Sequence, residues 1–465
     1  MPFIEIIVDL GFGDAGKGLL TDFLARRSGA SLVVRYNGGA QAGHNVMAPD
    51  GRHHTFSQFG SGTFVPGVRT FLARQVVVHP AALLAEGDIL RGKGIPDAFA
   101  RLRLSERALI ITPFHQAANR IRELGRGVER HGSCGVGVGE AVEDAQAYPA
   151  DAVLAGDLHR PAVLRRKLQR IRERKRAELA PVCRAAAPGS RLAWEACIFE
   201  SEAVVDAWIA SIARIAELGL VAPDEVLARW LGEAETAIFE GAQGVLLDAD
   251  AGFHPYTTWS RCTAENAFDL IREMAPGAPV ARIGVMRCYA VRHGPGPLPT
   301  ETGAFSAAVS EHNQAGEWQG AVRYGWFDAV LARYALETTG GVDALLVTHL
   351  DVLARLEQWR YSPGYEDVQD WPGASGDADL TGGVLRRLCA ARHLPLAQRA
   401  LLTEALSRVK PILETCPAEE RDMLRVIETL TGQPVSLVSR GPSAETVQII
   451  NAIPTQGKMP SEFSA

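Results

Sequence analysis

Residues 3–18 have the sequence Phe3-Ile-Glu-Ile-Ile-Val-Asp-Leu-Gly-Phe-Gly-Asp-Ala-Gly-Lys-Gly18, and this stretch decides the fold. It begins with a short apolar run and continues into a glycine-rich turn, after which apolar residues recur at helical spacing. The predicted order is therefore strand, loop, helix. In α/β proteins built from such units, the ligand lies at the carboxyl ends of the strands.

The same pattern of an apolar strand that ends in polar residues recurs along the chain. Ser31–Tyr36 and Thr70–His79 are predicted strands, and Pro80 opens a helix at the position where proline is best tolerated. Three later segments repeat the pattern: residues 237–250, 281–291 and 343–353. Such strands are typical of parallel sheets that are buried on both faces. We therefore expect an α/β fold with one large, mainly parallel sheet flanked by helices.

Composition restricts the class of protein. The 465 residues are 47% apolar and 22% charged, as in globular proteins. The formal charge of −6 disfavours a surface devoted to nucleic acid or anionic lipid, and no apolar run approaches the roughly 20 residues that span a bilayer. The first residues lack the basic segment of a signal peptide. Seven cysteines without a C-x-x-C pair indicate reduced thiols. We expect a cytoplasmic protein without nucleic-acid or membrane partners.

Two segments have unusual composition. Residues 158–179 predict a helix with a dense coat of arginine and lysine, which we interpret as a solvated face rather than a nucleic-acid patch because the rest of the chain is acidic. Tyr361–Gly383 is rich in glycine, proline and aspartate, which indicates an excursion or a hairpin with loops.

The glycine-rich turn satisfies the pattern G-x-x-x-x-G-K of a phosphate-binding loop, so the fold is expected to be P-loop-NTPase-like. Its backbone N–H groups would surround phosphate oxygens, and Lys17 would supply positive charge. Ordinary P-loops place Ser or Thr next to hold Mg²⁺, but here Gly18 has no side chain. Asp14 lies inside the loop, where it would repel phosphate unless it bound the metal or moved a proton. The alternative is a plain glycine-rich turn at a strand end.

A second glycine-rich cluster follows the next strand, Arg35-Tyr-Asn-Gly-Gly-Ala-Gln-Ala-Gly-His44-Asn45. Its position predicts that Gln41 and His44 line the same crevice at the carboxyl ends of the strands. Taken alone, a loop histidine is more often structural than catalytic.

These residues resemble the adenylosuccinate synthetase family, GTP-dependent enzymes that join aspartate to inosine monophosphate (IMP). The two loops are similar to the family's G-D-E-G-K-G-K and G-G-x-N-A-G-H-T motifs. Further matches follow in the family's order: Glu240-Gly-Ala-Gln-Gly244, Leu246-Leu-Asp248, Pro255-Tyr-Thr-Thr258, Gly294-Pro-Gly-Pro-Leu-Pro-Thr-Glu301, Gly325-Trp326 with Asp328, Thr348-His-Leu-Asp-Val-Leu353 and Ser439-Arg-Gly-Pro442. The segments near 160–235 and 355–410 match poorly. The resemblance implies one such domain over residues 1–465, with smaller subdomains, and a homodimer.

The resemblance also implies a mechanism. Asp14 would take the proton from N1 of the 6-oxopurine and bind Mg²⁺, with the Gly43 carbonyl as a second metal ligand. His44 would steady the phosphate that passes from GTP to the purine 6-oxygen, while Lys17 and backbone donors neutralise its charge. An amine then attacks C6 and expels phosphate.

The implied binding residues fall into three sets. GTP would be bound by Gly13, Gly16, Lys17, Gly18, Asp351, Ser439 and Gly441, the purine acceptor by Gln41, Cys134, Gln243 and Thr258, and the amine donor by Arg323. Asp351 has its own physical argument, because a carboxylate accepts both N1–H and N2–H₂ of guanine, donors that adenine lacks on that edge. The alternative for Asp351 is a strand-end cap. His349 stands where the family has a lysine.

Other positions depart from the family. Ala15, Gln41 and Asn45 replace Glu, Asn and Thr, and Ser133-Cys134 replaces a Thr-Thr pair. The partner subunit normally sends an arginine to the acceptor's phosphate from just before residue 156, yet residues 131–158 contain no Lys or Arg. Either another basic residue substitutes, or the acceptor carries no 5′-monophosphate.

The aspartate-binding loop also differs, since Trp318-Gln-Gly-Ala-Val-Arg-Tyr-Gly-Trp326 retains only Arg323 of a run of arginines. Aspartate needs donors for two carboxylates. Trp318 and Tyr324 either face an apolar or aromatic amine or pack the loop. The default expectation is ligation of IMP and L-aspartate with GTP and Mg²⁺. The alternatives are a specialised paralogue with another purine or amine, and a non-catalytic GTP-binding regulatory protein.

Overall fold

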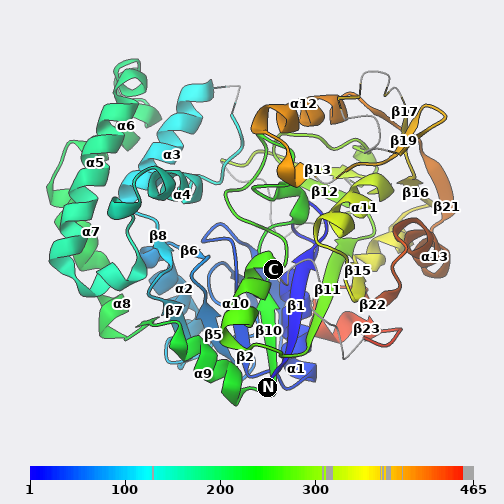
Figure 1. Ribbon diagram of the computed structural model, residues 1–465, viewed down its shortest axis with the longest axis horizontal. Coiled ribbons are helices and arrows are strands. Elements are labelled where there is room, and N and C mark those ends of the chain that lie inside the picture. The colour runs from blue at the N-terminus through cyan, green and yellow to red at the C-terminus, as the bar shows by residue number, and fades with distance from the viewer. Residues whose placement is uncertain are drawn as a thin grey trace.

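A ten-stranded sheet forms the centre of the computed structural model, which describes residues 1–127, 130–305, 308–309, 318–366, 368, 371–372, 379–389 and 391–453. The strand order is β23 (Val447–Ile449), β22 (Val435–Ser439), β15 (Ala344–Thr348), β11 (Val280–Arg287), β1 (Phe3–Asp9), β10 (Thr236–Glu240), β2 (Leu32–Arg35), β5 (Arg69–Leu72), β7 (Leu102–Ser105) and β9 (Val221–Ala222) (Figure 1). Neighbours pair in parallel, except that β23 is antiparallel to β22. The predicted large, mainly parallel sheet is confirmed.

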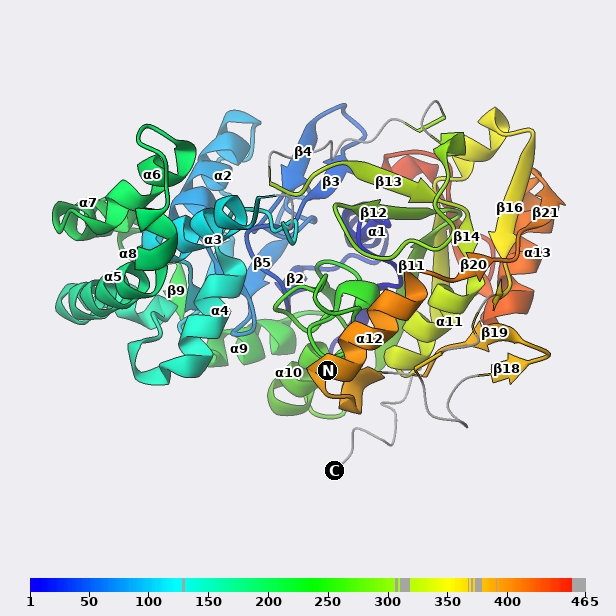
Figure 2. The same ribbon diagram turned by 90° about the horizontal axis from the view of Figure 1, so that it is seen from above.

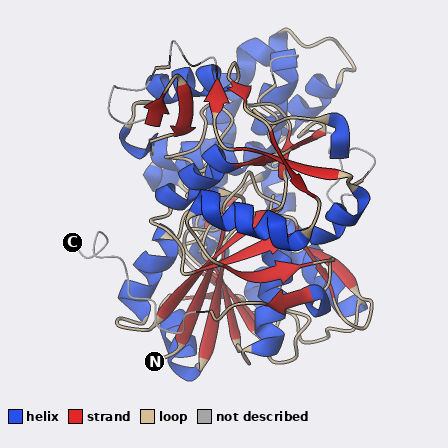
Figure 3. Ribbon diagram, turned by 90° about the vertical axis from the view of Figure 1, so that its right-hand side faces the viewer, coloured by secondary structure: helices blue, strands red, loops and turns tan. Residues whose placement is uncertain are grey.

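Strand β1 shows why this sheet is covered on both faces. Ile4, Ile6 and Val8 belong to one buried cluster, and Ile7 belongs to another. Helix α1 (Lys17–Arg27) contributes Leu20 and Leu24 to the cluster of Ile7. Side chains alternate across a strand, so apolar residues at every position from Phe3 to Val8 except Glu5 require helices on both sides. Figure 3 shows the strands fanned between helices.

The predicted strand Thr70–His79 is wrong in its extent. The chain forms β5, leaves the sheet, and continues as β6 (Val77–Val78), which pairs with β8 (Leu109–Ile110) in a separate small sheet. The break falls at Arg74, whose guanidinium forms an ion pair of 3.3 Å with Asp224. Helix α2 (Pro80–Gly92) then begins at Pro80 as predicted, and the His79 side chain accepts a hydrogen bond from the Ala82 N–H.

Helices stand together beside one end of the sheet, at the left of Figure 1. They are α3 (Pro113–Arg126), α4 (Val138–Ala147), α5 (Pro161–Arg184), α6 (Arg191–Ala196), α7 (Ala203–Ile212) and α8 (Arg214–Glu217), with α9 (Glu225–Glu233) following. The helix predicted over residues 158–179 is α5, which begins later because Ala155–His159 form a 3₁₀ turn.

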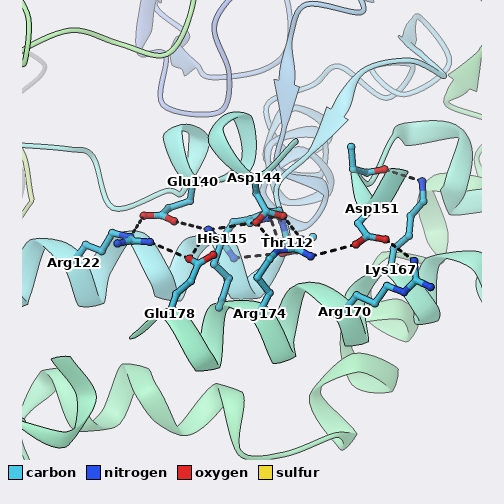
Figure 4. A network of polar contacts seen from close by, with 12 residues as sticks. Thr112, His115, Arg122, Glu140, Asp144, Asp151, Lys167, Arg170, Arg174 and Glu178 are labelled. Atoms are coloured by element: carbon cyan, nitrogen blue, oxygen red, sulfur yellow. Dashed lines mark hydrogen bonds and ion pairs between the residues drawn. The ribbon is translucent and has the colours of Figure 1, made fainter. Parts of the chain in front are cut away.

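The basic coat of α5 needs a correction. Arg174 contacts Asp144 at 2.6 Å and Asp151 at 3.2 Å, and Lys175 contacts Glu140 at 3.2 Å (Figure 4). Both side chains are largely buried, because the carboxylates of α4 lie against this face. Part of the coat is therefore an internal ion-pair network rather than a solvated face, and these cations are not available to a nucleic acid.

Smaller sheets lie over the carboxyl ends of the central strands and beside them (Figure 2). They are β12 (Ala290–His293) with β13 (Val322–Gly325), β3 (His44–Met47) with β4 (His53–Phe56), β14 (Phe327–Asp328) with β16 (Gln358–Ser362) and β21 (Glu414–Pro417), and β17 (Tyr365–Glu366) with β18 (Asp379–Thr381), β19 (Val384–Arg387) and β20 (Lys410–Pro411). Helices α10 (Glu265–Met274), α11 (Ala329–Thr338), α12 (Leu396–Leu406) and α13 (Glu420–Thr431) complete the described chain. The segment 361–383, predicted as an excursion or a hairpin with loops, contributes β17 and β18, which both pair with β19 beyond the segment and not with each other. Residues 367, 369–370 and 373–378 of this prediction lie outside the described part. No helix among the described residues has the length and apolar character needed to cross a membrane.

Candidate active site

A cavity of about 250 Å³ opens at the carboxyl ends of β1, β11, β15 and β22. It brings together nine residues predicted for the site: Asp14, Gly16, Lys17, Gly18, Gly43, His44, Asp351, Ser439 and Gly441. It is also lined by Thr348 and His349 of a matched motif, and by Arg287 and Arg355, which the sequence did not single out. Residues from four distant segments therefore meet at one edge of the sheet.

The phosphate loop is fixed by Asp9, the last residue of β1. The Asp9 carboxylate accepts hydrogen bonds from the N–H groups of Gly11 at 2.9 Å and Ala15 at 3.1 Å, and from Lys17 Nζ at 2.7 Å. Asp9 and Lys17 are both almost fully buried. The loop lysine is thus held by a buried ion pair at the start of α1.

Gly18 explains how this loop differs from ordinary P-loops. A Cβ atom at Gly18 would lie 2.9 Å from His44 Cβ and 3.1 Å from the Asn45 carbonyl oxygen. The start of β3 therefore occupies the space that a Ser or Thr side chain would fill. The loop has no room for the usual magnesium-binding hydroxyl.

Asp14 is held at two points. His293 Nε2 lies 2.7 Å from Asp14 Oδ2, and Arg287 Nε donates to the Asp14 carbonyl oxygen at 2.7 Å. Burial by itself would raise the pKa of Asp14, but His293, Arg287 and Lys17 outweigh it and hold this pKa well below its ordinary value. The carboxylate is therefore ionised at neutral pH, as a proton acceptor or metal ligand must be.

His44 is oriented by Glu240 at the end of β10. Its Nδ1 lies 2.6 Å from Glu240 Oε1, and Glu240 also accepts from the N–H and hydroxyl of Ser61. Burial raises the pKa of Glu240, but Arg35 and then His44 lower it to about 2. Burial, with Arg35, lowers the pKa of His44 to about 4. The imidazole is therefore neutral, and Nδ1 donates to Glu240.

The residues predicted for the acceptor lie outside this cavity. Gln243 is in the left-handed region with φ 56°, and its Oε1 would lie 3.0 Å from a Cβ at Gly38. Gln41 Oε1 would lie 2.9 Å from a Cβ at Gly39. Both amide oxygens are buried and have no hydrogen-bond partner among the described residues. Such oxygens are satisfied when a ligand donates to them.

Thr258 and Cys134 complete the predicted acceptor set. The Thr258 N–H donates to the Leu247 carbonyl at 2.8 Å, which keeps its loop against the segment after β10. Cys134 lies in the loop before α4, where burial raises the pKa of its thiol. That loop is held by Arg120, whose Nε donates to the Gly135 carbonyl at 3.0 Å.

Trp318 and Tyr324 pack the loop rather than line the cavity. A Cβ at Gly135 would lie 2.8 Å from the Trp318 ring, and the guanidinium of Arg191 lies 5.2 Å from the ring centroid. The Tyr324 ring lies 6.2 Å from that of Tyr289. Both side chains thus have packing partners, and the alternative that they face an amine stays a prediction.

Arg323 is engaged with its own hairpin. Its Nε and Nη2 donate to Glu301 at 3.0 and 2.5 Å, and its Nη1 donates to the carbonyls of Gly294 and Gly296 at 2.9 Å. Arg323 does not line the cavity. A donor carboxylate would have to share or replace the contact with Glu301.

The proposed guanine contacts come from the end of β15 and of β22. Asp351 lies exposed in the short helix Leu350–Arg355 and makes no side-chain hydrogen bond to the described residues, which argues against a capping role. His349 is left-handed with φ 63°, and its Nδ1 lies 2.8 Å from Thr348 Oγ1. Ser439 Oγ donates to the Gly441 carbonyl at 2.8 Å.

Four residues of the site were not assigned from the sequence: Asp9, Glu240, Arg287 and His293. All four end a strand: Asp9, Glu240 and Arg287 end strands of the central sheet, and His293 ends β12 of the two-stranded sheet. Charged residues at the ends of apolar strands were the available signal. Their partners lie far away in the sequence, so spacing alone did not reveal them.

The fold and the site define a P-loop-like α/β enzyme that binds a nucleotide at the carboxyl edge of its sheet. The chain belongs to the adenylosuccinate synthetase family, whose model matches residues 6–448. It is accordingly a ligase that forms a carbon–nitrogen bond.

Relatives support this assignment over nearly the whole chain. The adenylosuccinate synthetase of Nitrosomonas europaea is 32% identical over 449 residues, covering 95% of this chain and 97% of that protein. The synthetase of Mycobacterium tuberculosis (strain H37Rv) is also 32% identical, covering 96% and 97%. These full-length matches include the segments near 160–235 and 355–410 that match poorly by eye.

Solved structures share the fold. The fully ligated adenylosuccinate synthetase from Plasmodium falciparum superposes with a TM-score of 0.74 at 19% identity, covering 96% of this chain and 99% of that one. The cyanophage S-2L succinoaminodeoxyadenylate synthetase, bound to dGMP and dATP as an energy donor, has a TM-score of 0.50 at 17% identity, covering 97% and 95%.

Proposed function

We propose that this protein is a GTP- and Mg²⁺-dependent ligase that phosphorylates the 6-oxo group of IMP and joins L-aspartate at C6, giving adenylosuccinate, GDP and phosphate. The observation that carries the proposal is the single cavity that holds Asp14, Lys17, His44 and Asp351 together. Family membership supports the same reaction. The comparisons favour neither the specialised paralogue nor the regulatory protein.

The residues at the loop fit a magnesium ion. The Asp14 carboxylate and the Gly43 backbone both line the cavity, and oxygen is the ligand atom that Mg²⁺ prefers. The described residues contain no group of three or more side chains that could hold a metal. One carboxylate, one carbonyl and the phosphates of GTP would therefore hold the ion, which is how Mg²⁺ is usually bound with nucleotides. When bound, it would neutralise charge on the transferring phosphoryl group.

The side chains then divide the chemistry. Asp14 accepts the proton from N1 of the purine, so that the 6-oxygen becomes nucleophilic and takes the γ-phosphoryl group of GTP. Lys17 and the loop N–H groups bind the phosphates, and His44 contacts the group in transfer. The amine attacks C6, the C6–O bond breaks, and phosphate leaves. Gln243 holds the purine, while Gln41, Cys134 and Thr258 hold the rest of the acceptor.

The donor and the assembly complete the proposal. We place the carboxylate of the amino acid at Arg323, where it would exchange with Glu301, because both groups compete for the same planar set of N–H donors. Gly13, Gly16, Gly18, Ser439 and Gly441 complete the GTP site. The homodimer, the cytoplasmic location and the single domain over residues 1–465 are part of the same proposal by family resemblance.

The decisive experiment follows the products. Wild-type protein with IMP, GTP, Mg²⁺ and L-aspartate should release phosphate and form adenylosuccinate, measured by mass spectrometry. The variant Asp14→Ala should release none while still binding GDP by calorimetry, and Asp50→Ala, at an exposed surface acid, should behave as wild type. Failure of the wild type with each of the twenty amino acids would exclude the proposed ligation. Turnover unaffected in D14A would exclude the assigned base.

A further inference from the structure

We infer that His293 is a positioning residue, which holds the Asp14 carboxylate in the orientation that the reaction requires. The inference rests on the proposed function, in which Asp14 is the proton acceptor. It concerns a histidine outside the GTP cavity whose contact with the loop comes from a different part of the chain, 279 residues away.

The contact is direct. His293 Nε2 lies 2.7 Å from Asp14 Oδ2, and the only hydrogen-bonding role of an ionised carboxylate is to accept, so Nε2 donates. Arg287 fixes the carbonyl of the same residue at 2.7 Å. Asp14 has φ 57°, a left-handed conformation that non-glycine residues adopt rarely and only when their surroundings hold them there. His293 and Arg287 supply that support at the side chain and at the backbone.

The histidine itself is held on a rigid frame. The next residue toward the N-terminus, Arg292, is 2% exposed. Its Nε and Nη1 donate to the carbonyls of Pro295 at 2.9 Å and Pro297 at 3.1 Å, and its guanidinium lies 4.2 Å from the centroid of the Phe12 ring in the loop. On the other side, His293 pairs with Val322 of β13. The position of the imidazole is therefore set by the pairing of β12 with β13 and by the contacts of Arg292, one of which reaches the loop at Phe12.

The same frame carries the proposed donor residue. In the register of β12 and β13, Arg292 is opposite Arg323, one position from His293. One two-stranded sheet thus contacts the proposed base Asp14 through His293 and holds the proposed donor residue Arg323 opposite the neighbouring Arg292. Loss of the His293 contact is expected to impair the chemical step more than the binding of GTP, because Lys17 and Asp351 do not contact His293.

Two variants separate positioning from a general structural role. His293→Gln keeps an N–H donor at a similar distance from the backbone, and His293→Val removes it. We expect kcat to fall at least about 30-fold in H293V, with KM for GTP within about threefold of wild type, and to recover to within about fivefold in H293Q. The melting temperature should be similar in both. His159→Val, at an exposed histidine of the helical region, is the control.

A second measurement does not depend on turnover. In crystal structures, Asp14 should keep its left-handed backbone and its carboxylate position in H293Q, and its carboxylate should turn away in H293V. An unmoved Asp14 carboxylate in H293V, normal kcat in H293V, or H293Q as impaired as H293V would overturn the inference. Absence of turnover in the wild type would instead strike the proposed function, and the crystal structures would still decide the role of His293.

Discussion

The glycine at position 18 shows how one missing side chain changes the chemistry that a loop can support. In ordinary P-loops a hydroxyl at this position binds the metal, but here the backbone of β3 fills that space. The oxygen ligands proposed for the metal, the Asp14 carboxylate and the Gly43 carbonyl, belong to the two segments that meet at this close contact. The missing hydroxyl and the carboxylate in the loop are therefore related, because Asp14 is proposed to bind the metal that the hydroxyl would otherwise bind.

A serine at this position should not restore an ordinary loop. We expect Gly18→Ser to lower the free energy of unfolding by about 1–3 kcal/mol and to reduce kcat, because its Cβ would press on His44 Cβ and the Asn45 carbonyl. Chemical denaturation and steady-state rates measure both effects. Gly92→Ser, at a helix position with open space around it, should be close to neutral. A fully active and equally stable G18S would contradict the packing described for the loop.

Asp351 offers a second test at the scale of one residue. Its carboxylate makes no side-chain hydrogen bond to the described residues, so it remains available for the guanine edge. We expect Asp351→Asn to weaken GTP binding by roughly 10- to 150-fold, since hydrogen bonds to charged groups contribute about 1.5–3 kcal/mol, and to leave kcat at saturating GTP nearly unchanged. Calorimetry with GTP and ATP measures the effect. Equal GTP affinity in D351N would refute the base contact.

At the scale of the elements, strand β1 contains a buried acidic residue, Glu5. Glu5 is 5% exposed between apolar neighbours, and burial raises its pKa from 4.5 to about 7, against smaller opposing effects of Ser28 and Arg27. The folded protein thus keeps a proton that the unfolded chain releases above about pH 4.5. The free energy of unfolding therefore falls as the pH rises through this range.

The variant Glu5→Gln removes this dependence. We expect its free energy of unfolding, relative to wild type, to increase by roughly 2–3 kcal/mol between about pH 5 and about pH 8, with the full gain above pH 7. Urea denaturation across this range measures the difference. Glu225→Gln, at an exposed position of α9, should give a constant difference. A pH-independent offset in E5Q would show that Glu5 does not hold a proton in the folded state.

The helices α4 and α5 are joined by the ion-pair network around Asp144 (Figure 4). Asp144 lies 2.6 Å from Arg174 and 3.4 Å from Lys175, with 3% of its side chain exposed. Burial raises the pKa of Asp144, but the nearby His115 and the hydrogen bonds from Arg174 lower it well below its ordinary value. Its contribution to stability is therefore present above its ordinary pKa near 3.8 and is lost as the pH falls below it.

Removal of this one charge should be costly. We expect Asp144→Asn to lower the free energy of unfolding by about 3–5 kcal/mol at neutral pH, because it removes the buried carboxylate that Arg174 and Lys175 share. The exposed pair Arg176–Glu200, at 2.7 Å, is the matched control. Glu200→Gln should cost about 1 kcal/mol or less. Similar losses in the two variants would contradict the distinction between an internal network and a surface pair.

At the scale of the whole molecule, the sequence predicted the strands of the sheet better than it predicted contacts between residues that are distant in the sequence. Apolar runs located β1, β2, β10, β11 and β15, since periodicity is a local property of the chain. It failed at residues 70–79, where β5 ends at Leu72 and Arg74 forms an ion pair with the distant Asp224. Local patterns do not contain such partners.

In the candidate site, too, residues in local sequence motifs were predicted, whereas the roles of residues that act through distant contacts were not. Asp14, Lys17 and His44 were found because they sit in glycine-rich loops whose backbone shape has a recognisable sequence. Glu240 lay within a matched motif without an assigned role, and His293 lay one residue before another such motif. Their roles depend on contacts across 196 and 279 residues, which only the folded chain defines.

The ion pair of Lys17 with Asp9 has a consequence for how nucleotide arrives. Among the described residues that line the cavity, the cations are Lys17, Arg287 and Arg355 and the anions are Asp14 and Asp351, and Lys17 is also paired with the buried Asp9. An approaching magnesium nucleotide therefore meets little long-range attraction and depends on short-range fit once it has entered. Its association rate should change less than about threefold when the ionic strength rises from about 0.05 to about 0.3 M, whereas steered encounters slow steeply. Stopped-flow fluorescence with a labelled GTP measures this rate, and a steep decline would indicate an attracting field that these six charges do not provide.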